Sequence, residues 1–127
     1  MERRKARILI AGGSESGRTR LKAYLDGANR EFAVEVDGRG ALAAISSFGP
    51  DLVVLGAIES KPIGLEVCKQ LKHDPATAGV MVLMIVPLGD LGDIERVVEA
   101  GADDFLSEPP HAAELRTRVD NLLRLRL

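Results

Sequence analysis

The chain has 127 residues, 46% of them hydrophobic and 28% charged, which indicates one globular domain spanning residues 1–127 and excludes a disordered chain. The formal net charge of −2 gives no sign of a nucleic-acid partner, and no apolar stretch is long enough for a signal peptide or a membrane span. The single cysteine excludes an internal disulfide, so the composition fits a cytoplasmic protein without a membrane partner.

Apolar runs of strand length alternate five times with segments of helical periodicity. The expected strands are Arg7–Ala11, Phe32–Val36, Leu52–Leu55, Val80–Val86 and Asp103–Leu106. The expected helices cover about Ser16–Gly27, Arg39–Phe48, Leu65–Lys72, Gly92–Ala100 and His111–Leu125. Runs such as Met81 to Ile85 are apolar on both faces, which is typical of a parallel sheet covered by helices on both sides.

Five strand–helix units with short connections predict an α/β fold. The expected architecture is a flavodoxin-like (βα)5 domain, whose doubly wound five-stranded parallel sheet has the strand order 2-1-3-4-5. In such a sheet the functional crevice lies beyond the carboxyl ends of the first and third strands. Those ends are Ala11-Gly12-Gly13 and Leu55-Gly56-Ala57, so we expect any functional site to lie there.

Three segments add a family resemblance to this pattern. They are Pro50–Leu55, Gly64–Lys72 and Glu99–Ser107, and they occur in the right order within the five-fold arrangement. From Arg7 to about Leu125 the chain resembles the receiver domain of bacterial response regulators. The resemblance implies a module of two-component, phosphorelay signal transduction that is not an enzyme.

The phosphorylation chemistry of that family uses five positions. An acidic pair holds Mg²⁺, an aspartate accepts the phosphoryl group, and a Thr or Ser and a Lys bind its oxygens. By resemblance these positions fall on Gly12 and Gly13, Gly56, Val86 and Glu108. Glycine can neither attack a phosphodonor nor offer side-chain oxygens to Mg²⁺, and Glu108 reverses the charge of the lysine. The chain is therefore interpreted as a degenerate member, a pseudo-receiver, without catalytic residues, metal or cofactor.

The segment Gly12–Thr19 supports a second interpretation. It reads G-x-x-x-x-G-Arg-Thr between a strand and a helix, and it differs by one residue from a phosphate-binding P-loop, which has lysine at the position of Arg18. The candidate anion-binding residues are Gly12, Gly13, Ser14, Ser16, Gly17, Arg18 and Thr19. In the plainer interpretation Ser14 or Ser16 caps the first helix. A domain that binds a small anion or nucleotide in the vacated crevice is therefore the alternative function.

Other chemically notable residues are expected to be structural. The loop acids that converge on the crevice are interpreted as solvated charges and not as metal ligands: Glu15, Glu59, Asp90 and Glu108. Cys68 lies on the apolar face of the third helix and is expected in the core. Phe105 matches, by resemblance, the aromatic residue whose orientation reports phosphorylation in the family. Without a phosphoryl group it is expected to keep one orientation.

The expected mode of action is contact with a protein partner or with a second copy of the chain. In the family that the chain resembles, the face built from the fourth helix, fifth strand and fifth helix mediates dimerisation. The candidate interface residues on that face are Val98, Asp103, Asp104, Glu114, Arg118 and Arg124. The segment Leu122–Leu127 resembles the point where receivers continue into an output domain, which suggests one module of a longer chain.

Overall fold

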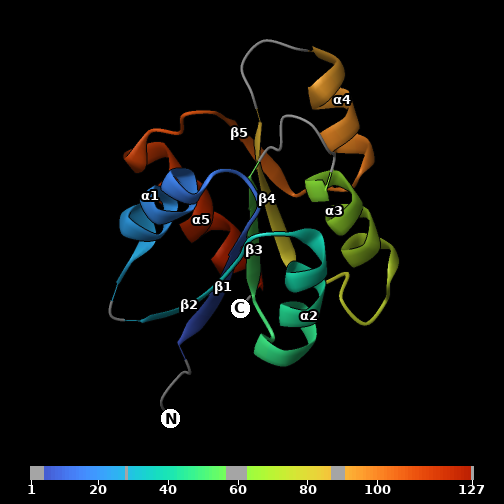
Figure 1. Ribbon diagram of the computed structural model, residues 1–127, viewed down its shortest axis with the longest axis horizontal. Helices are drawn as coiled ribbons and strands as arrows, with labels where there is room; N and C mark the ends of the chain where they lie inside the picture. The colour runs from blue at the N-terminus through green and yellow to red at the C-terminus, as the bar shows by residue number, and fades with distance from the viewer. Residues whose placement is uncertain (1–4, 28, 57–62, 87–90, 127) are drawn as a thin grey trace.

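The computed structural model describes residues 5–27, 29–56, 63–86 and 91–126. Strands and helices alternate along the chain (Figure 1). The strands are β1 Ala6–Ala11, β2 Arg30–Glu35, β3 Leu52–Gly56, β4 Met81–Val86 and β5 Asp104–Ser107. The helices are α1 Glu15–Leu25, α2 Gly38–Phe48, α3 Ile63–His73, α4 Leu91–Glu99 and α5 Ala112–Arg126. Each expected element is therefore present, with bounds shifted by one or two residues.

The five strands form one parallel sheet in the order β2-β1-β3-β4-β5, which confirms the predicted flavodoxin-like topology. The register places Ile10 beside Val54, and Val54 beside Leu83, so the carboxyl ends of β1, β3 and β4 lie at one edge of the sheet. Helices α1 and α5 cover one face, and α2, α3 and α4 cover the other (Figure 1).

Two hydrophobic cores follow from the alternation of side chains along the strands. Leu9 and Val53 join the cluster beneath α2, α3 and α4, whereas Ile8 and Val54 join the cluster beneath α1 and α5. Neighbouring residues of a strand point to opposite faces, so strands that are covered on both sides must be apolar throughout. All residues of β3 are buried, as this argument requires.

Side chains at the helix ends explain where the first two helices begin. The Ser14 hydroxyl accepts a hydrogen bond from the Gly17 amide at 3.0 Å, which caps α1. The Asp37 carboxylate accepts one from the Gly40 amide at 2.8 Å and caps α2 in the same way. Helix α2 ends at Gly49, whose φ of 66° lies in the left-handed region that favours glycine.

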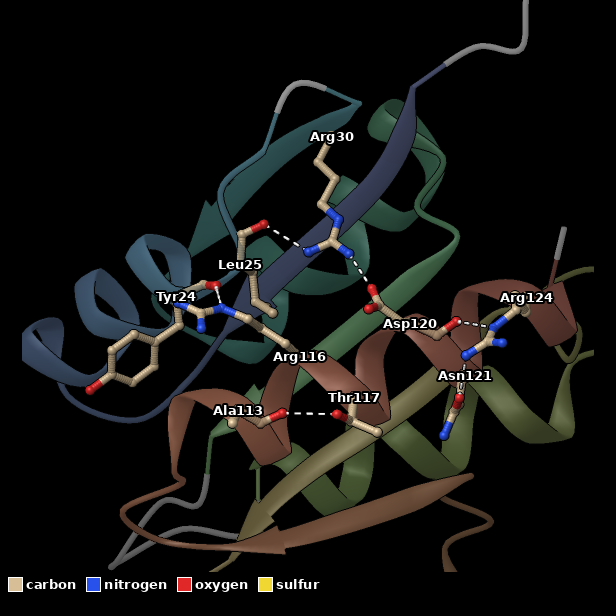
Figure 2. A network of polar contacts seen from close by, with 9 residues as sticks. All are labelled: Tyr24, Leu25, Arg30, Ala113, Arg116, Thr117, Asp120, Asn121 and Arg124. Atoms are coloured by element: carbon tan, nitrogen blue, oxygen red, sulfur yellow. Dashed lines mark hydrogen bonds and ion pairs between the residues drawn. The ribbon is translucent and has the colours of Figure 1, made fainter.

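Hydrogen bonds and an ion pair join α5 to the segment where α1 ends and β2 begins (Figure 2). The guanidinium of Arg30 donates to the Leu25 carbonyl at 2.9 Å and forms an ion pair with Asp120 of α5. The Nε of Arg116 donates to the Tyr24 carbonyl, also at 2.9 Å. The last helix is therefore tied to the end of α1 and the start of β2. In the described ranges, no helix is long and apolar enough to cross a membrane.

Candidate functional site

The crevice at the carboxyl edge of the sheet is lined mainly by glycine backbone. Gly12 and Gly13 follow β1, and Gly56 ends β3. These glycines line a hollow of about 30 Å³ together with side chains from α1 and the segment that follows β5. The structure therefore brings the ends of β1 and β3 together as predicted.

Gly56 is in direct contact with the β1–α1 loop. A Cβ atom at this position would lie 3.0 Å from both the Cα and the N of Gly13, and 3.1 Å from the carbonyl carbon of Gly12. Those neighbours are backbone atoms, so they cannot yield as the end of a flexible side chain would. The end of β3 therefore favours glycine, because any side chain would require the loop backbone to shift.

The β1–α1 loop uses left-handed backbone at two successive residues. Gly12 has a φ of 77° and Gly13 a φ of 71°. A residue with a side chain is strained in this region, at a cost of about 1 kcal/mol or more. The two positions that by resemblance correspond to the acidic pair therefore have a backbone conformation suited to glycine.

Arg18 folds back onto this loop. Its Nη1 donates to the Gly13 carbonyl at 2.6 Å and to the Gly12 carbonyl at 3.2 Å, and only 9% of the residue is exposed. The candidate anion-binding segment is thus a compact turn whose arginine binds backbone oxygens of the same turn. From the sequence, Arg18 was expected only as a possible ligand of a bound anion. Its position five and six residues after the two glycines nevertheless permits hydrogen bonds to their carbonyls.

The remaining candidates of that segment lie at the start of α1. Ser14 is the helix cap, and its hydroxyl also lies 3.3 Å from that of Ser16. Gly17 donates its amide to the cap, and the Arg18 amide donates to the Ser14 carbonyl at 2.9 Å. Thr19 is exposed on the helix surface. Ser14 therefore accepts hydrogen bonds from two amides of the first turn, those of Gly17 and Arg18.

Val86 and Glu108 lie at the ends of adjacent segments. Val86 ends β4 and is buried, and its carbonyl accepts a hydrogen bond from the Glu108 amide at 2.7 Å. Glu108 lines the same hollow as Gly12, Gly13 and Gly56. Four of the five predicted positions therefore surround one space, with Val86 next to it.

Carboxylates are sparse around this hollow. Glu108 is the only acidic residue among the described residues that line it. Glu15 starts α1 and is exposed, while Glu59 and Asp90 lie outside the described residues. Within the described ranges, no group of three or more His, Cys, Asp or Glu residues could hold a metal ion.

The face formed by α4, β5 and α5 contains most of the candidate interface residues. Val98 of α4 is 62% exposed. Arg118 of α5 lies 3.1 Å from the Asp104 carboxylate of β5 and 3.9 Å from that of Glu114. These three residues, of which Asp104 is half-buried, form ion pairs within the chain.

Asp103 and Arg124 have other partners. The Asp103 carboxylate lies 2.7 Å from the Lys72 ammonium and accepts the Val82 amide at 2.7 Å, so it joins β5 to α3 and β4. Arg124 donates to the Asn121 side chain at 2.6 Å, on the side of α5 that carries Asp120 (Figure 2). Asp103 and Arg124 therefore have partners within the chain, as Asp104, Glu114 and Arg118 do.

Cys68 and Phe105 are part of the core below the site. Cys68 is fully buried, and its thiol lies 3.4 Å from the Ala100 carbonyl. Burial raises the pKa of this thiol to about 11, so it stays protonated and unreactive at neutral pH. Phe105 of β5 is partly buried against the cluster beneath α2, α3 and α4.

Comparisons with known proteins agree with this architecture. Residues 8–120 match the model of the response regulator receiver domain family. The chain is 35% identical over 122 residues to the response regulator PleD of Caulobacter vibrioides, covering 96% of this chain and 27% of PleD. It is 34% identical to the DNA-binding dual master transcriptional regulator RpaA of Synechocystis, covering 93% of this chain and 49% of RpaA.

A solved structure supports the same fold. The signal receiver domain of a signal transduction histidine kinase from Syntrophus aciditrophicus superposes with a TM-score of 0.85 at 29% identity. The match covers 94% of this chain and 90% of that one. The chain thus spans nearly all of a solved single domain, but about half or less of the two curated relatives.

Proposed function

We propose that this chain, which belongs to the family of response regulator receiver domains, is a signalling module that works by protein contact without taking up a phosphoryl group. The observation that carries the proposal is the presence of glycine at three crevice positions, Gly12, Gly13 and Gly56. They stand where the family resemblance expects the acidic pair and the phosphoacceptor. The module is accordingly a pseudo-receiver and not an enzyme.

The chemistry of these positions supports the proposal. An acyl phosphate forms only on a carboxylate, and Gly56 has no side chain. A phosphoryl group also needs cationic neighbours, whereas Glu108 brings negative charge to the hollow. A divalent cation that could offset this charge has no ligand set among the described residues.

The geometry of the crevice supports it as well. Gly56 packs closely against Gly13 beside a small hollow that Glu108 also lines. The alternative function, binding of a small anion or nucleotide by Gly12–Thr19, would need free amides at the start of α1. Ser14 accepts from the amides of Gly17 and Arg18, and the Arg18 side chain donates to loop carbonyls, so these groups of the segment are already engaged within the chain, which favours the protein-contact module.

The partner surface proposed for this module is the face formed by α4, β5 and α5. It combines the exposed apolar side chain of Val98 with the charged trio Asp104, Glu114 and Arg118. A surface that carries both signs of charge can pair with itself across a two-fold axis, as a homodimer does. The partner is therefore a second copy or another protein, and an output domain of a longer chain is a further candidate.

Incubation with acetyl phosphate and Mg²⁺, followed by intact-mass measurement, tests the proposal directly. We expect no mass increase of one phosphoryl group, under conditions that label a receiver domain carrying the aspartate. We also expect millimolar Mg²⁺ to leave the melting temperature unchanged, because only ligands bound by the native state raise stability. An acid-labile, hydroxylamine-sensitive phosphate on the intact protein would refute the proposal.

A thermal-shift series with phosphate and adenine nucleotides tests the alternative function, the binding of a small anion or nucleotide in the crevice. Binding at 100 times the dissociation constant would stabilise the fold by about 2.7 kcal/mol, which is readily seen as a higher melting temperature. We expect no such shift. A saturable rise would instead assign the crevice to a ligand.

A further inference from the structure

Two backbone carbonyls in the crevice converge on one buried cation. The carbonyls of Gly12 and Gly13 both accept from Nη1 of Arg18, at 3.2 and 2.6 Å. Two successive glycines with positive φ allow the turn that brings both oxygens to the same atom. The turn and the arginine are five to six residues apart in sequence, so the contact is local.

Arg18 is buried, so its positive charge depends on hydrogen-bond acceptors within the protein. Only 9% of the residue is exposed, and a guanidinium stays charged at every physiological pH. A buried charge is tolerated only where hydrogen bonds replace its water. The acceptors that the structure supplies are carbonyl oxygens of the Gly12–Gly13 turn, so this turn is what stabilises the charge.

The same contact fixes the loop over the end of β3. The loop backbone packs against Gly56 so closely that a Cβ there would lie 3.0 Å from Gly13. Loss of the guanidinium would leave both carbonyls unpaired beside a small hollow that Arg18 itself lines. The loop would then lose the contact that holds it to α1.

We propose that the Gly12 and Gly13 carbonyls form a guanidinium-binding site that Arg18 occupies, and that this occupancy holds the β1–α1 loop closed over the ends of β1 and β3. The ligand class of the site is a planar organic cation, supplied here by the chain. The inference depends on the loop geometry and not on the proposed function. A failed phosphorylation test would leave it intact, and its own failure would leave the phosphorylation result unchanged.

Chemical rescue of Arg18→Ala tests the site, because alanine empties it and leaves room for a free guanidinium ion. The matched control is Arg20→Ala, which removes the same charge from an exposed residue of α1 that lines the same hollow. We expect Arg18→Ala to lower the melting temperature by about 5–15 °C and Arg20→Ala to change it by less than about 3 °C.

Guanidinium chloride at about 50 mM, compared with equimolar sodium chloride, should then raise the melting temperature of Arg18→Ala by about 3 °C if it binds with a dissociation constant of about 25 mM. The wild type and Arg20→Ala should show no rise, because guanidinium otherwise acts as a weak denaturant. Equal responses of the two alanine variants, or equal stability of both, would overturn the proposal.

Should Arg18→Ala fail to fold, Arg18→Lys provides the second test. Its ammonium keeps the charge but sits on a shorter side chain than Nη1 of Arg18, so it reaches the two carbonyls less well and the loop should be held less firmly. The amides of Gly12 and Gly17 donate to the Glu35 carbonyl and the Ser14 hydroxyl, and we expect their hydrogen exchange to be at least about fivefold faster than in the wild type, with exchange in β3 less affected. Identical exchange at the loop amides would overturn the proposal.

Discussion

Gly56 shows how one residue can determine what a crevice is able to do. It offers no side chain that could act as a nucleophile, and a Cβ there would lie only 3.0 Å from backbone atoms of Gly13 in the β1–α1 loop. The chemical change and the packing change at this position are therefore coupled. Restoring an aspartate would require the loop to move, which also disturbs the backbone around Gly12 and Gly13.

The substitution Gly56→Asp is expected to destabilise the protein without allowing phosphorylation. Its Cβ would lie 3.0 Å from Gly13 backbone atoms, and overpacking of this kind costs about 1–3 kcal/mol. The carboxylate would also face Glu108 in the same hollow without a bound cation. Urea unfolding measures the loss, and intact mass after acetyl phosphate treatment measures phosphorylation.

Gly27→Asp is the matched control for this substitution, because a Cβ at Gly27 meets nothing within 4 Å. It should change stability by less than about 0.5 kcal/mol, as surface substitutions usually do. Efficient labelling of Gly56→Asp would mean that metal ligands exist near the crevice, with Glu59 and Asp90 the first candidates to test.

Cys68 is expected to be inert towards thiol reagents in the folded protein. Burial raises the pKa of its thiol to about 11 from an ordinary value of 9.0, so between pH 9 and 11 the unfolded chain releases a proton that the folded chain retains. Stability therefore falls as the pH rises through this interval, by up to about 2–3 kcal/mol. Comparing the unfolding free energies of the wild type and Cys68→Ala at pH 8 and pH 10.5 isolates this contribution.

The expected result is a steeper loss with pH for the wild type than for Cys68→Ala. Ellman's reagent at pH 8 should label the thiol only after denaturation. Rapid labelling of the native protein would contradict the buried position of the thiol.

At the scale of elements, the end of α3 is anchored through Lys72. Its ammonium donates to the carbonyls of Ala78 and Val80 at 3.1 and 2.8 Å and pairs with Asp103 at 2.7 Å. One side chain thus joins α3, the start of β4 and the start of β5. Asp103 has a structural role here, although the family resemblance alone had placed it among the interface residues.

Lys72→Met is expected to destabilise the fold by about 1–3 kcal/mol, because it leaves two carbonyls and a carboxylate without their shared donor. The apolar stem is kept, so the loss reports the ammonium contacts. Lys69→Met, on an exposed position of the same helix, should be nearly neutral. A double-mutant cycle with Asp103→Asn should show coupling of at least about 0.5 kcal/mol, and additive effects would disprove the anchor.

The predicted strand bounds agree best with the structure where both faces of the strand are buried. They agree less well where the strand is partly exposed. The apolar runs of β1, β3 and β4 define these strands by themselves, since both faces are covered. Strand β2 begins at Arg30, two residues before the predicted Phe32, because Arg30 and Glu31 pair with Ala6 and Arg7 of β1. Charged residues on an edge strand conceal its start from any pattern based on hydrophobicity.

For the molecule as a whole, the sequence predicted where the crevice lies but not the side-chain contacts within it. The strand order places Gly12, Gly13 and Gly56 together, and this followed from topology alone. The contact of Arg18 with the glycine carbonyls depends on side-chain torsions and on two positive φ angles, which no residue pattern specifies. The ion pair of Arg30 with Asp120 joins residues far apart in the chain and was likewise not predictable.

The proposed partner surface on α4, β5 and α5 is also a property of the whole molecule. Asp104 and Arg118 are paired within the chain at 3.1 Å, but Arg118 is 45% exposed, and ion pairs at such sites contribute only about 0–1 kcal/mol. The pair can therefore be exchanged for reciprocal pairs across a two-fold axis at little cost. Val98, which is 62% exposed, would supply apolar area beside them.

If the chain self-associates through this face, Arg118→Glu should weaken the dimer by at least about tenfold in dissociation constant, since like charges would then face Asp104. The charge swap Asp104→Arg with Arg118→Glu should restore much of the affinity, because opposite charges again meet within and between chains. Arg39→Glu on α2, away from this face, is the control and should have no effect. Sedimentation velocity over a concentration series measures each association constant, with and without acetyl phosphate, which should change none of them. Equal weakening by Arg118→Glu and Arg39→Glu, or a swap that fails to recover, would place the interface elsewhere on the molecule.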